Sequence, residues 1–392
     1  RVETDSMTSL VNDHLRNIEN LRKVALQNSV PPSYTFNPIP LGKKLSIVQK
    51  PFRVSDYSRT KLPVNQEELA WYTVGELSAL IHSGQITSEK LTRFFLDRLR
   101  KYDHTLRCVV TYTDSLAMAQ ARQADRELAS GKDRGMLHGI PFGIKDIFYT
   151  KGYRTTYGTP LFKDQIINVD ASVVVKLRNA GAVMIAKLST GELAMDDVWF
   201  GGQTRNPWDT VKGSSGSSAG PASAVSAGLV PFAIGSETWG SIISPATVCG
   251  VTALRPTFGR VSRYGAMTLS WTMDKIGPLC RNAEDCAIVL QAINGADELD
   301  YSVMDVPFNY NPVINLKKLR IGVLSKDFDK DKPSNKSFNE AALLLLKNAG
   351  ATLVPVDLPD FPYMDMMLQL DCEAASAFED LIFSNKDDQM VQ

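Results

Sequence analysis

The sequence predicts an α/β fold in which helices lie over a central sheet, and two observations lead to this class. From Ile140 onward, short apolar runs alternate with segments of helical pattern, the order expected of α/β layers. The chain also has 392 residues, of which 44% are hydrophobic. That is enough to bury a large core, either in one large domain or in two modest ones.

The N-terminal part differs from the rest in composition. Residues 6–24 predict a polar amphipathic helix, and the Pro-, Ser- and Lys-rich stretch from Pro31 to about Lys61 predicts an extended arm without a core of its own. We therefore expect residues 1–65 to form an N-terminal helix and arm, and residues 66–392 to form the main domain. The first helix of that domain is predicted at Thr73–Ser83, because Thr73 and Glu76 form a capping box.

The remaining elements follow from periodicity and from turn residues. Further helices are expected at Ser88–Lys101, Ser115–Leu128, Val173–Ala180, Ala219–Gly228, Glu284–Ile293, Asn339–Asn348 and Glu373–Phe383. Strands are expected at Ala182–Ala186, Val230–Ile234, Leu319–Leu324 and Thr352–Val356.

Composition excludes several classes of function. Lys plus Arg and Asp plus Glu number 43 each, which argues against nucleic-acid binding through a broad basic surface. Five cysteines and four histidines follow no metal-ligand spacing, so we expect reduced thiols, no metal and no cofactor. No apolar run reaches the roughly 18 residues of a membrane span. We expect an intracellular protein, in the cytoplasm or an organelle lumen. Because the sequence begins at Arg1, targeting cannot be predicted from it.

The most unusual stretch runs from Gly213 to Pro256. It contains G-S-S-G-S-S-A-G-P-A-S-A and, after the apolar run V-P-F-A-I, G-S-E-T-W-G-S-I-I-S-P-A. Flexible linkers do not alternate with apolar strands in this way. Gly and Ser among core segments instead indicate backbone packed closely around a reacting centre.

A serine nucleophile needs a base, and lysine is the candidate. The sequence has no G-x-S-x-G elbow followed by a histidine, which disfavours an α/β-hydrolase arrangement. Lys145 ends the apolar run G-I-P-F-G-I-K-D-I, where burial would favour the neutral amine that a base requires. A lysine that snorkels from a strand end is the alternative interpretation.

Together these segments resemble the amidase signature family. The run from Gly139 to Asp146 is similar to that family's lysine strand, Gly216–Gly220 to its G-S-S-G-G loop, and Thr238–Ile242 to its nucleophile loop. Ser217 and Ser241 stand 24 positions apart, as in the family. Further matches are Pro245-Ala246, Cys249-Gly250, Leu254–Ser262, Asp274–Pro278, Asp170-Ala171, Leu177 and Ala180–Ala182. The resemblance covers roughly residues 70–300 and implies a central mixed sheet with helices on both sides.

The resemblance also implies roles for the matched residues. Ser241 would attack the amide carbonyl, and neutral Lys145 would act as the base. Ser217, which an unusual cis peptide holds in the family, would pass the proton between them. Backbone N–H groups of Thr238, Trp239, Gly240 and Ser241 would line the oxyanion hole.

Three positions in the nucleophile loop depart from the family pattern. The family has Gly at the position of Trp239, Arg at that of Ile243 and Asp at that of Glu237. We expect the indole of Trp239 to narrow the substrate pocket, with Thr190, Met195 and Trp199 completing its wall; packing of Trp239 into the core is the alternative. Family members also extend further at the C-terminus, so we expect the C-terminal part of the domain to be incomplete.

The sequence leaves three readings of function open. The first is hydrolysis of the amide bond of a small substrate through an acyl-enzyme. The second is a glutamine-hydrolysing A-type subunit of a tRNA-dependent amidotransferase, and the third is a catalytically impaired amidase-like binding protein. The expected partner is a small amide, with no direct contact to nucleic acid and no membrane span, and a homo-oligomer stays open.

Overall fold

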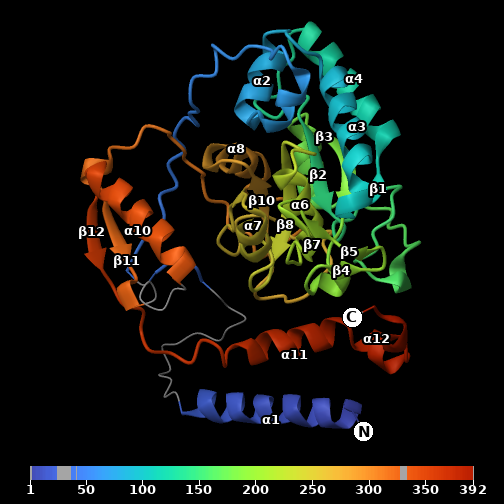
Figure 1. The fold of residues 1–392 in the computed structure, drawn as a ribbon, viewed down its shortest axis with the longest axis vertical. Coiled ribbons are helices and arrows are strands. Elements are labelled where there is room, and N and C mark those ends of the chain that lie inside the picture. The colour runs from blue at the N-terminus through green and yellow to red at the C-terminus, as the bar shows by residue number, and fades with distance from the viewer. Residues whose placement is uncertain (1, 24–36, 41, 327–332, 392) are drawn as a thin grey trace. The chain divides into compact units, whose positions relative to one another are not determined.

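The computed structural model describes residues 2–23, 37–40, 42–326 and 333–391, which form two compact units. One unit comprises Arg1–Leu26 and Asn311–Gln369, and the other comprises Gln27–Tyr310 and Leu370–Gln392 (Figure 1). The second unit contains the motifs that the sequence singled out. The predicted division at residue 65 stays a prediction.

A six-stranded mixed sheet forms the centre of the larger unit. Its strands, in spatial order, are β1 (Val109–Tyr112), β3 (Val183–Leu188), β2 (Pro141–Lys145), β8 (Phe232–Glu237), β10 (Lys275–Cys280) and β9 (Thr252–Ala253). β2 pairs in parallel with both β3 and β8, whereas the outer pairs are antiparallel. Two small hairpins join β4 (Val198–Trp199) to β5 (Gly202–Gln203) and β6 (Arg205–Asn206) to β7 (Asp209–Gly213).

Helices pack against this sheet, which confirms the predicted α/β class. Those in contact with its strands are α3 (Ser88–Leu106), α4 (Asp114–Ala129), α6 (Ala219–Ser226), α7 (Ile243–Cys249) and α8 (Ala283–Ile293). The larger unit also contains α2 (Val74–His82), α5 (Ser172–Asn179) and α12 (Glu379–Phe383), whereas α11 (Met367–Ala377) begins in the smaller unit and ends in the larger one. α4 contacts β3, α6 contacts β8, and α8 contacts β10 (Figure 1). The predicted capping box is present, since Thr73 Oγ1 accepts from the Glu76 N–H and Glu76 Oε2 accepts from the Thr73 N–H.

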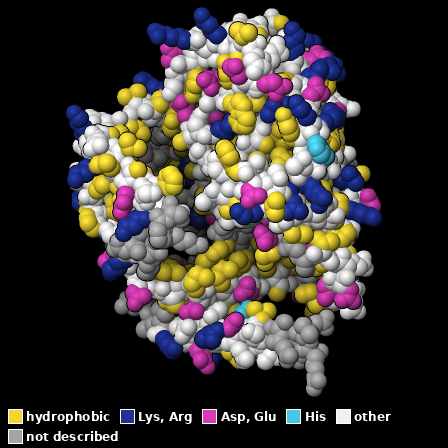
Figure 2. Space-filling model, in the orientation of Figure 1, with side chains coloured by type: hydrophobic (Ala, Val, Ile, Leu, Met, Phe, Trp, Pro, Cys, Tyr) yellow, Lys and Arg dark blue, Asp and Glu magenta, His cyan; other side chains and the backbone are white. Residues whose placement is uncertain are grey.

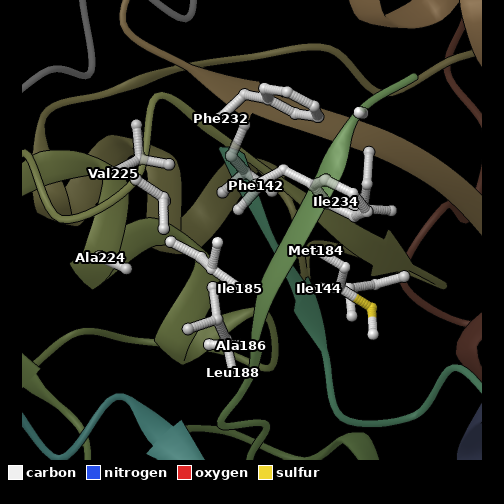
Figure 3. Packing of buried hydrophobic residues seen from close by; sticks show 14 of the residues in the cluster. Phe142, Ile144, Met184, Ile185, Ala186, Leu188, Ala224, Val225, Phe232 and Ile234 are labelled. Atoms are coloured by element: carbon white, nitrogen blue, oxygen red, sulfur yellow. The ribbon is translucent and has the colours of Figure 1, made fainter. Parts of the chain in front are cut away.

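The central strands are apolar because both of their faces are buried. Every residue of β2 and β3 is buried. The rings of Phe142 and Phe232 stack across neighbouring strands with their centroids 5.3 Å apart, and Val225 of α6 belongs to the same buried cluster (Figure 3). This packing fixes the position of β2, and therefore of the residue that ends it, Lys145.

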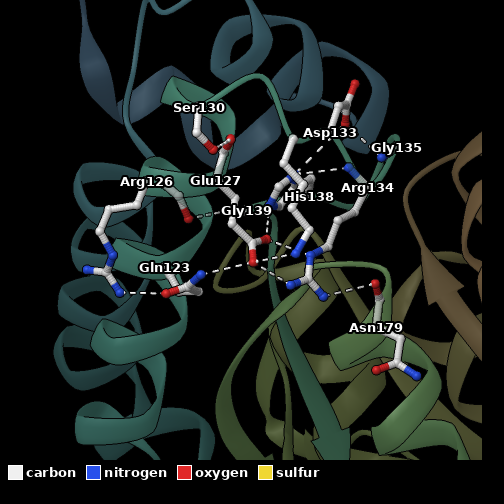
Figure 4. Close-up of polar contacts among 12 residues, drawn as sticks. Gln123, Arg126, Glu127, Ser130, Asp133, Arg134, Gly135, His138, Gly139 and Asn179 are labelled. Atoms are coloured by element: carbon white, nitrogen blue, oxygen red, sulfur yellow. Dashed lines mark hydrogen bonds and ion pairs between the residues drawn. The ribbon is translucent and has the colours of Figure 1, made fainter.

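A charged cluster ties α4 to the loop that leads into β2 (Figure 4). Glu127 Oε2 accepts from Arg134 Nε at 2.6 Å, Glu127 Oε1 accepts from Lys132 Nζ at 3.1 Å, and Glu127 Oε2 lies 3.3 Å from Nε2 of the buried His138. The hydrogen bonds from Arg134 are the main cause that lowers the pKa of Glu127 well below its ordinary value. The cluster adds polar contacts to a loop whose Leu137 and Ile140 already pack in the core.

The smaller unit is a separate α/β element. It contains α1 (Val2–Arg22), β11 (Arg320–Val323), α10 (Pro333–Asn348) and β12 (Thr352–Pro355), and its two strands pair in parallel.

In the larger unit, the arm packs through Phe52 against Phe308 and Tyr310, and Tyr57 Oη donates to Glu284 Oε2 at 2.7 Å. Short 3-10 helices occupy Gln66–Trp71, Pro160–Phe162, Glu192–Ala194, Leu316–Lys318 and Asp387–Gln389.

Two predicted helices are longer than expected, since α3 ends at Leu106 rather than Lys101 and α10 begins at Pro333 rather than Asn339, and a third is interrupted. The single helix expected at Glu373–Phe383 is divided between α11 and α12, because Phe378 leaves the helical region at φ −119° and ψ 13°. Among the described residues, no helix is both long and apolar enough to cross a membrane. On the face drawn in Figure 2, Lys and Arg side chains are interspersed with Asp and Glu.

Candidate active site

Lys145 is the centre of the candidate site because it is a fully buried cation without a salt bridge among the described residues. It ends β2 and is 0% exposed. Its Nζ donates to Ser217 Oγ at 2.7 Å and to Ser236 Oγ at 2.9 Å. Burial lowers the pKa of Lys145 to about 7, against the opposing effects of Asp274 and Glu237. Near neutral pH this amine can therefore both accept and return a proton.

Ser217 is held by a loop that has no room for a side chain at the preceding residue, Gly216. The peptide bond between Gly216 and Ser217 is cis, and Ser217 itself is 1% exposed. A Cβ on Gly216 would lie 1.6 Å from the carbonyl oxygen of Asp196, so only glycine fits there. The loop leads directly into α6, whose first residue is Ala219.

Ser241 lies next to this loop in the turn between β8 and α7. The carbonyl oxygen of Ser241 accepts from the N–H of Ser218 at 3.0 Å. The backbone of Ser241 therefore lies beside the backbone of Ser218, the residue that follows Ser217. Ser241 is partly exposed, and its hydroxyl makes no hydrogen bond within the described part of the chain. The structure thus joins Lys145 to Ser217 directly and brings Ser241 near them, without a hydrogen bond between the two serine hydroxyls.

The residues expected to line the oxyanion hole form the turn before Ser241. Thr238 is fixed by two contacts: its Oγ1 donates to Asp274 Oδ1 at 2.5 Å, and its carbonyl oxygen accepts from Lys275 Nζ at 2.9 Å. Within the described residues, the N–H groups of Trp239, Gly240 and Ser241 have no acceptor in the protein. Three neighbouring free donors can bind a developing oxyanion.

Glu237 braces the same turn. It is 1% exposed, and its Oε2 accepts from the N–H groups of Ile242 and Ile243 at 2.8 and 2.9 Å. Its Oε1 accepts from Arg255 Nη1 at 2.9 Å. Arg255 therefore supplies a positive charge to this turn, although position 243, where the family has Arg, holds Ile.

Sequence reasoning assigned no role to Ser236 or Asp274. Ser236 is the second hydroxyl on Lys145, and its backbone is held by Ser218, whose Oγ donates to Ser236 O at 3.0 Å. Asp274 lies within a motif that matched the family, and Ser236 lies two residues before the predicted nucleophile turn. Their nearness in sequence to these segments is the feature from which a role could have been suggested. Their contacts with Lys145 and Thr238 depend on strand pairing that the sequence does not specify.

The residues predicted to form the pocket wall lie in different environments. Trp239 and Met195 are 45% and 67% exposed, whereas Thr190 is fully buried. Trp199 is buried, and its indole N–H donates to the carbonyl oxygen of Arg107 at 3.2 Å. None of the four lines the cavity of about 530 Å³ that reaches Ser236 and Thr238. The predicted wall stays a prediction.

No group of three or more His, Cys, Asp and Glu side chains in the described ranges could hold a metal ion. All five cysteines are free thiols, four of them buried and Cys372 exposed. The chemistry available at the site is that of hydroxyls, one buried amine and backbone donors.

Comparisons with known proteins find related sequences and related folds. The amidase family model matches residues 90–390. The glutamyl-tRNA(Gln) amidotransferase A subunit of Methylococcus capsulatus is 41% identical over 295 residues, which are 74% of this chain and 61% of that protein. Among solved structures, native peptide amidase from Stenotrophomonas maltophilia is 32% identical with a TM-score of 0.71, covering 81% of this chain and 72% of that one. The corresponding amidotransferase chain from Thermotoga maritima is 29% identical with a TM-score of 0.65, covering 83% and 68%. The chain thus spans less than two thirds of the curated relative from Methylococcus.

Proposed function

The chain belongs to the amidase family, and on this premise we propose that it cleaves a carbon–nitrogen amide bond through an acyl-enzyme formed on Ser241. Ser217 and Lys145 complete the proposed triad. The observation that carries the proposal is the fully buried amine of Lys145, 2.7 Å from Ser217 Oγ and with its pKa lowered to about 7.

The reaction proceeds in two halves. Neutral Lys145 takes the proton of Ser217 while Ser217 takes that of Ser241, whose oxygen attacks the amide carbon. The free N–H groups of the Trp239–Ser241 turn stabilise the oxyanion. The proton then returns through Ser217 to the leaving nitrogen, the C–N bond breaks, and an ester remains on Ser241. Water, deprotonated along the same path, attacks that ester and releases the acid and the free serine.

Labelling by a fluorophosphonate tests the nucleophile. Ser241→Ala should abolish both amidase turnover and labelling, because neither an acyl-enzyme nor a phosphonylated serine can form. Ser244→Ala is a matched control, since Ser244 lies three positions further on in the same segment and, within the described residues, its exposed hydroxyl forms a hydrogen bond only with Ser215. The control should retain labelling. Labelling of Ser241→Ala at the wild-type rate would remove Ser241 from this role. An unreactive wild-type chain would favour the amidase-like binding protein.

A second candidate function is a glutamine-hydrolysing component of a tRNA-dependent amidotransferase. The names of the curated relatives favour it over hydrolysis of an unrelated small amide. An independent amidase should hydrolyse simple amides alone. A component of such a complex should hydrolyse glutamine, and its rate should rise when the other chains of the complex are added. Glutamine turnover that never responds to added partner chains would argue against this second function.

A further inference from the structure

The cavity beside the nucleophile turn contains four charged side chains. It has a volume of about 530 Å³, and its lining includes Ser236 and Thr238 together with Arg263, Asp274, Lys275 and Asp300. All of these residues belong to the larger unit. The cavity therefore opens next to the place where the acyl carbon would be attacked, and its charges can act on the acyl part of a substrate.

Three of the four charged groups are already engaged by the protein. Asp274 accepts from the Thr238 hydroxyl through Oδ1 and from the N–H groups of Leu269 and Ser270 through Oδ2. Asp300 and Arg263 pair with each other, at 3.0 Å between Arg263 Nε and Asp300 Oδ2. Arg263 also donates to the Trp271 carbonyl and to Ser302 Oγ. These groups retain little capacity for a ligand.

Lys275 differs from them. Its Nζ donates to the carbonyl oxygen of Thr238 at 2.9 Å, and it forms no salt bridge within the described residues, although the charges of Glu237 and Asp274 act on it from beyond contact distance. An ammonium group has three donors, so two remain for a ligand. A half-buried cation that lacks an anionic partner binds a carboxylate more strongly than it would in water, because the surrounding protein screens the attraction less.

We propose that Lys275 binds a carboxylate of the substrate, so that the site selects amides whose acyl part carries a carboxylate. The inference rests on the proposed function. It applies both to a small amide and to glutamine, because glutamine also carries a carboxylate. Ser241 follows Thr238 by three residues, a span of at most about 11 Å even in a fully extended chain. The Lys275 contact and the nucleophile therefore belong to one short turn, so a small acyl part can carry both the carboxylate and the amide.

Two probes of equal chain length test the inference. Glutaramate has a carboxylate where glutaramide has a second, neutral amide. Lys275→Gln removes the charge and keeps an N–H donor for the Thr238 carbonyl. It should lower kcat/KM for glutaramate about tenfold or more beyond any change for glutaramide, the effect of one lost charge-assisted hydrogen bond. Lys275→Arg should preserve the preference for glutaramate. Equal losses on both probes would overturn the inference.

A binding measurement separates this inference from the proposed catalytic mechanism. In a Ser241→Ala background, calorimetry should show tighter binding of glutaramate than of glutaramide, and Lys275→Gln should remove the difference. Absence of any preference in that background overturns the role of Lys275. Loss of fluorophosphonate labelling in Lys275→Gln would show instead that the residue supports the nucleophile turn, which also contradicts a role confined to substrate binding. Failure of the wild type to label counts against the proposed function alone.

Discussion

At the scale of single residues, the site depends on keeping Lys145 neutral. The residue is fully buried, and its hydrogen-bond partners are two hydroxyls, neither of which carries a charge. Removing an ammonium from water costs free energy that the charges of Asp274 and Glu237 offset only in part, which is why the pKa of Lys145 falls from the ordinary value for lysine to about 7. The burial that the apolar strand predicts for Lys145 is also what the proposed role as a base requires.

The pKa of Lys145 predicts the pH dependence of turnover. The folded pKa lies below the ordinary one, so the amine is neutral above about pH 7 and protonated below it. kcat/KM for a neutral amide should therefore fall about tenfold for each pH unit below about 7, following the neutral fraction. Glutaramide avoids any contribution from ionisation of the substrate. A rate that stays level down to pH 5 would contradict a neutral lysine base.

Lys145 and Ser217 should behave as one unit because they share one proton path. Each of Lys145→Ala and Ser217→Ala should slow turnover by a factor on the order of 10² or more, as expected for lost acid–base catalysis. The double variant should be little slower than either single variant. Single-turnover rates of the three variants, compared in a double-mutant cycle, measure this directly. Losses that multiply would indicate that the two residues act independently.

At the scale of elements, the turn between β8 and α7 is held both by contacts within its own sequence and by a contact from a distant segment. The Gly-, Ser- and Trp-containing turn follows directly from its sequence, and so does the neighbouring strand. Glu237 accepts a hydrogen bond from the N–H of Ile242 at the other end of the turn, whereas Arg255 donates to Glu237 from a position 18 residues further along the chain. Only the fold could reveal that second support.

Loss of Arg255 should loosen this turn. Arg255→Met leaves the buried Glu237 carboxylate without its charged partner, which should slow fluorophosphonate labelling of Ser241 and lower kcat more than it changes KM. Arg255→Lys should restore part of the labelling rate. Arg178→Met is a suitable control, because Arg178 is exposed to a similar extent, 47% against 49%, and pairs with Asp170 away from the turn. Equal labelling rates in Arg255→Met and in the control would exclude this supporting role.

Elements with strong local signals were predicted closely, and contacts between distant segments were not. The capping box of Thr73 and Glu76 located α2 to within one residue at each end. The helix expected at Glu373–Phe383 is interrupted at Phe378, and Glu373, within α11, accepts hydrogen bonds from Thr272 and Ser270, which are remote in sequence. Lys145 could be selected because it ends an apolar run, which is a local signal. Its contact with Ser236 could not be predicted, because it depends on how distant strands pair.

At the scale of the whole molecule, apolar burial is distributed unevenly between the two compact units. Within the described residues, the larger unit contains nearly all the buried hydrophobic side chains, including those of β2, β3 and β8. In the smaller unit, Ala351 is the only hydrophobic residue that is buried to that degree among the described residues, and Phe338, Leu344 and Leu345 of α10 are exposed. Because buried apolar area is the main stabilising contribution, the two units should differ in local stability.

Amide hydrogen exchange should show this difference. Amides of β11, β12 and α10 should exchange through local opening, many times faster than those of β2 and β8, which should open only on global unfolding because their side chains are in the core. A matched comparison is the parallel pair β11–β12 against the parallel pair β2–β8, since both are hydrogen-bonded in the same manner. Binding of a fluorophosphonate to Ser241 should slow exchange in the turn after β8 and leave β11 and β12 unchanged. Equal protection of the two strand pairs would mean that the smaller unit unfolds together with the larger one, and that its few buried contacts do not determine its stability.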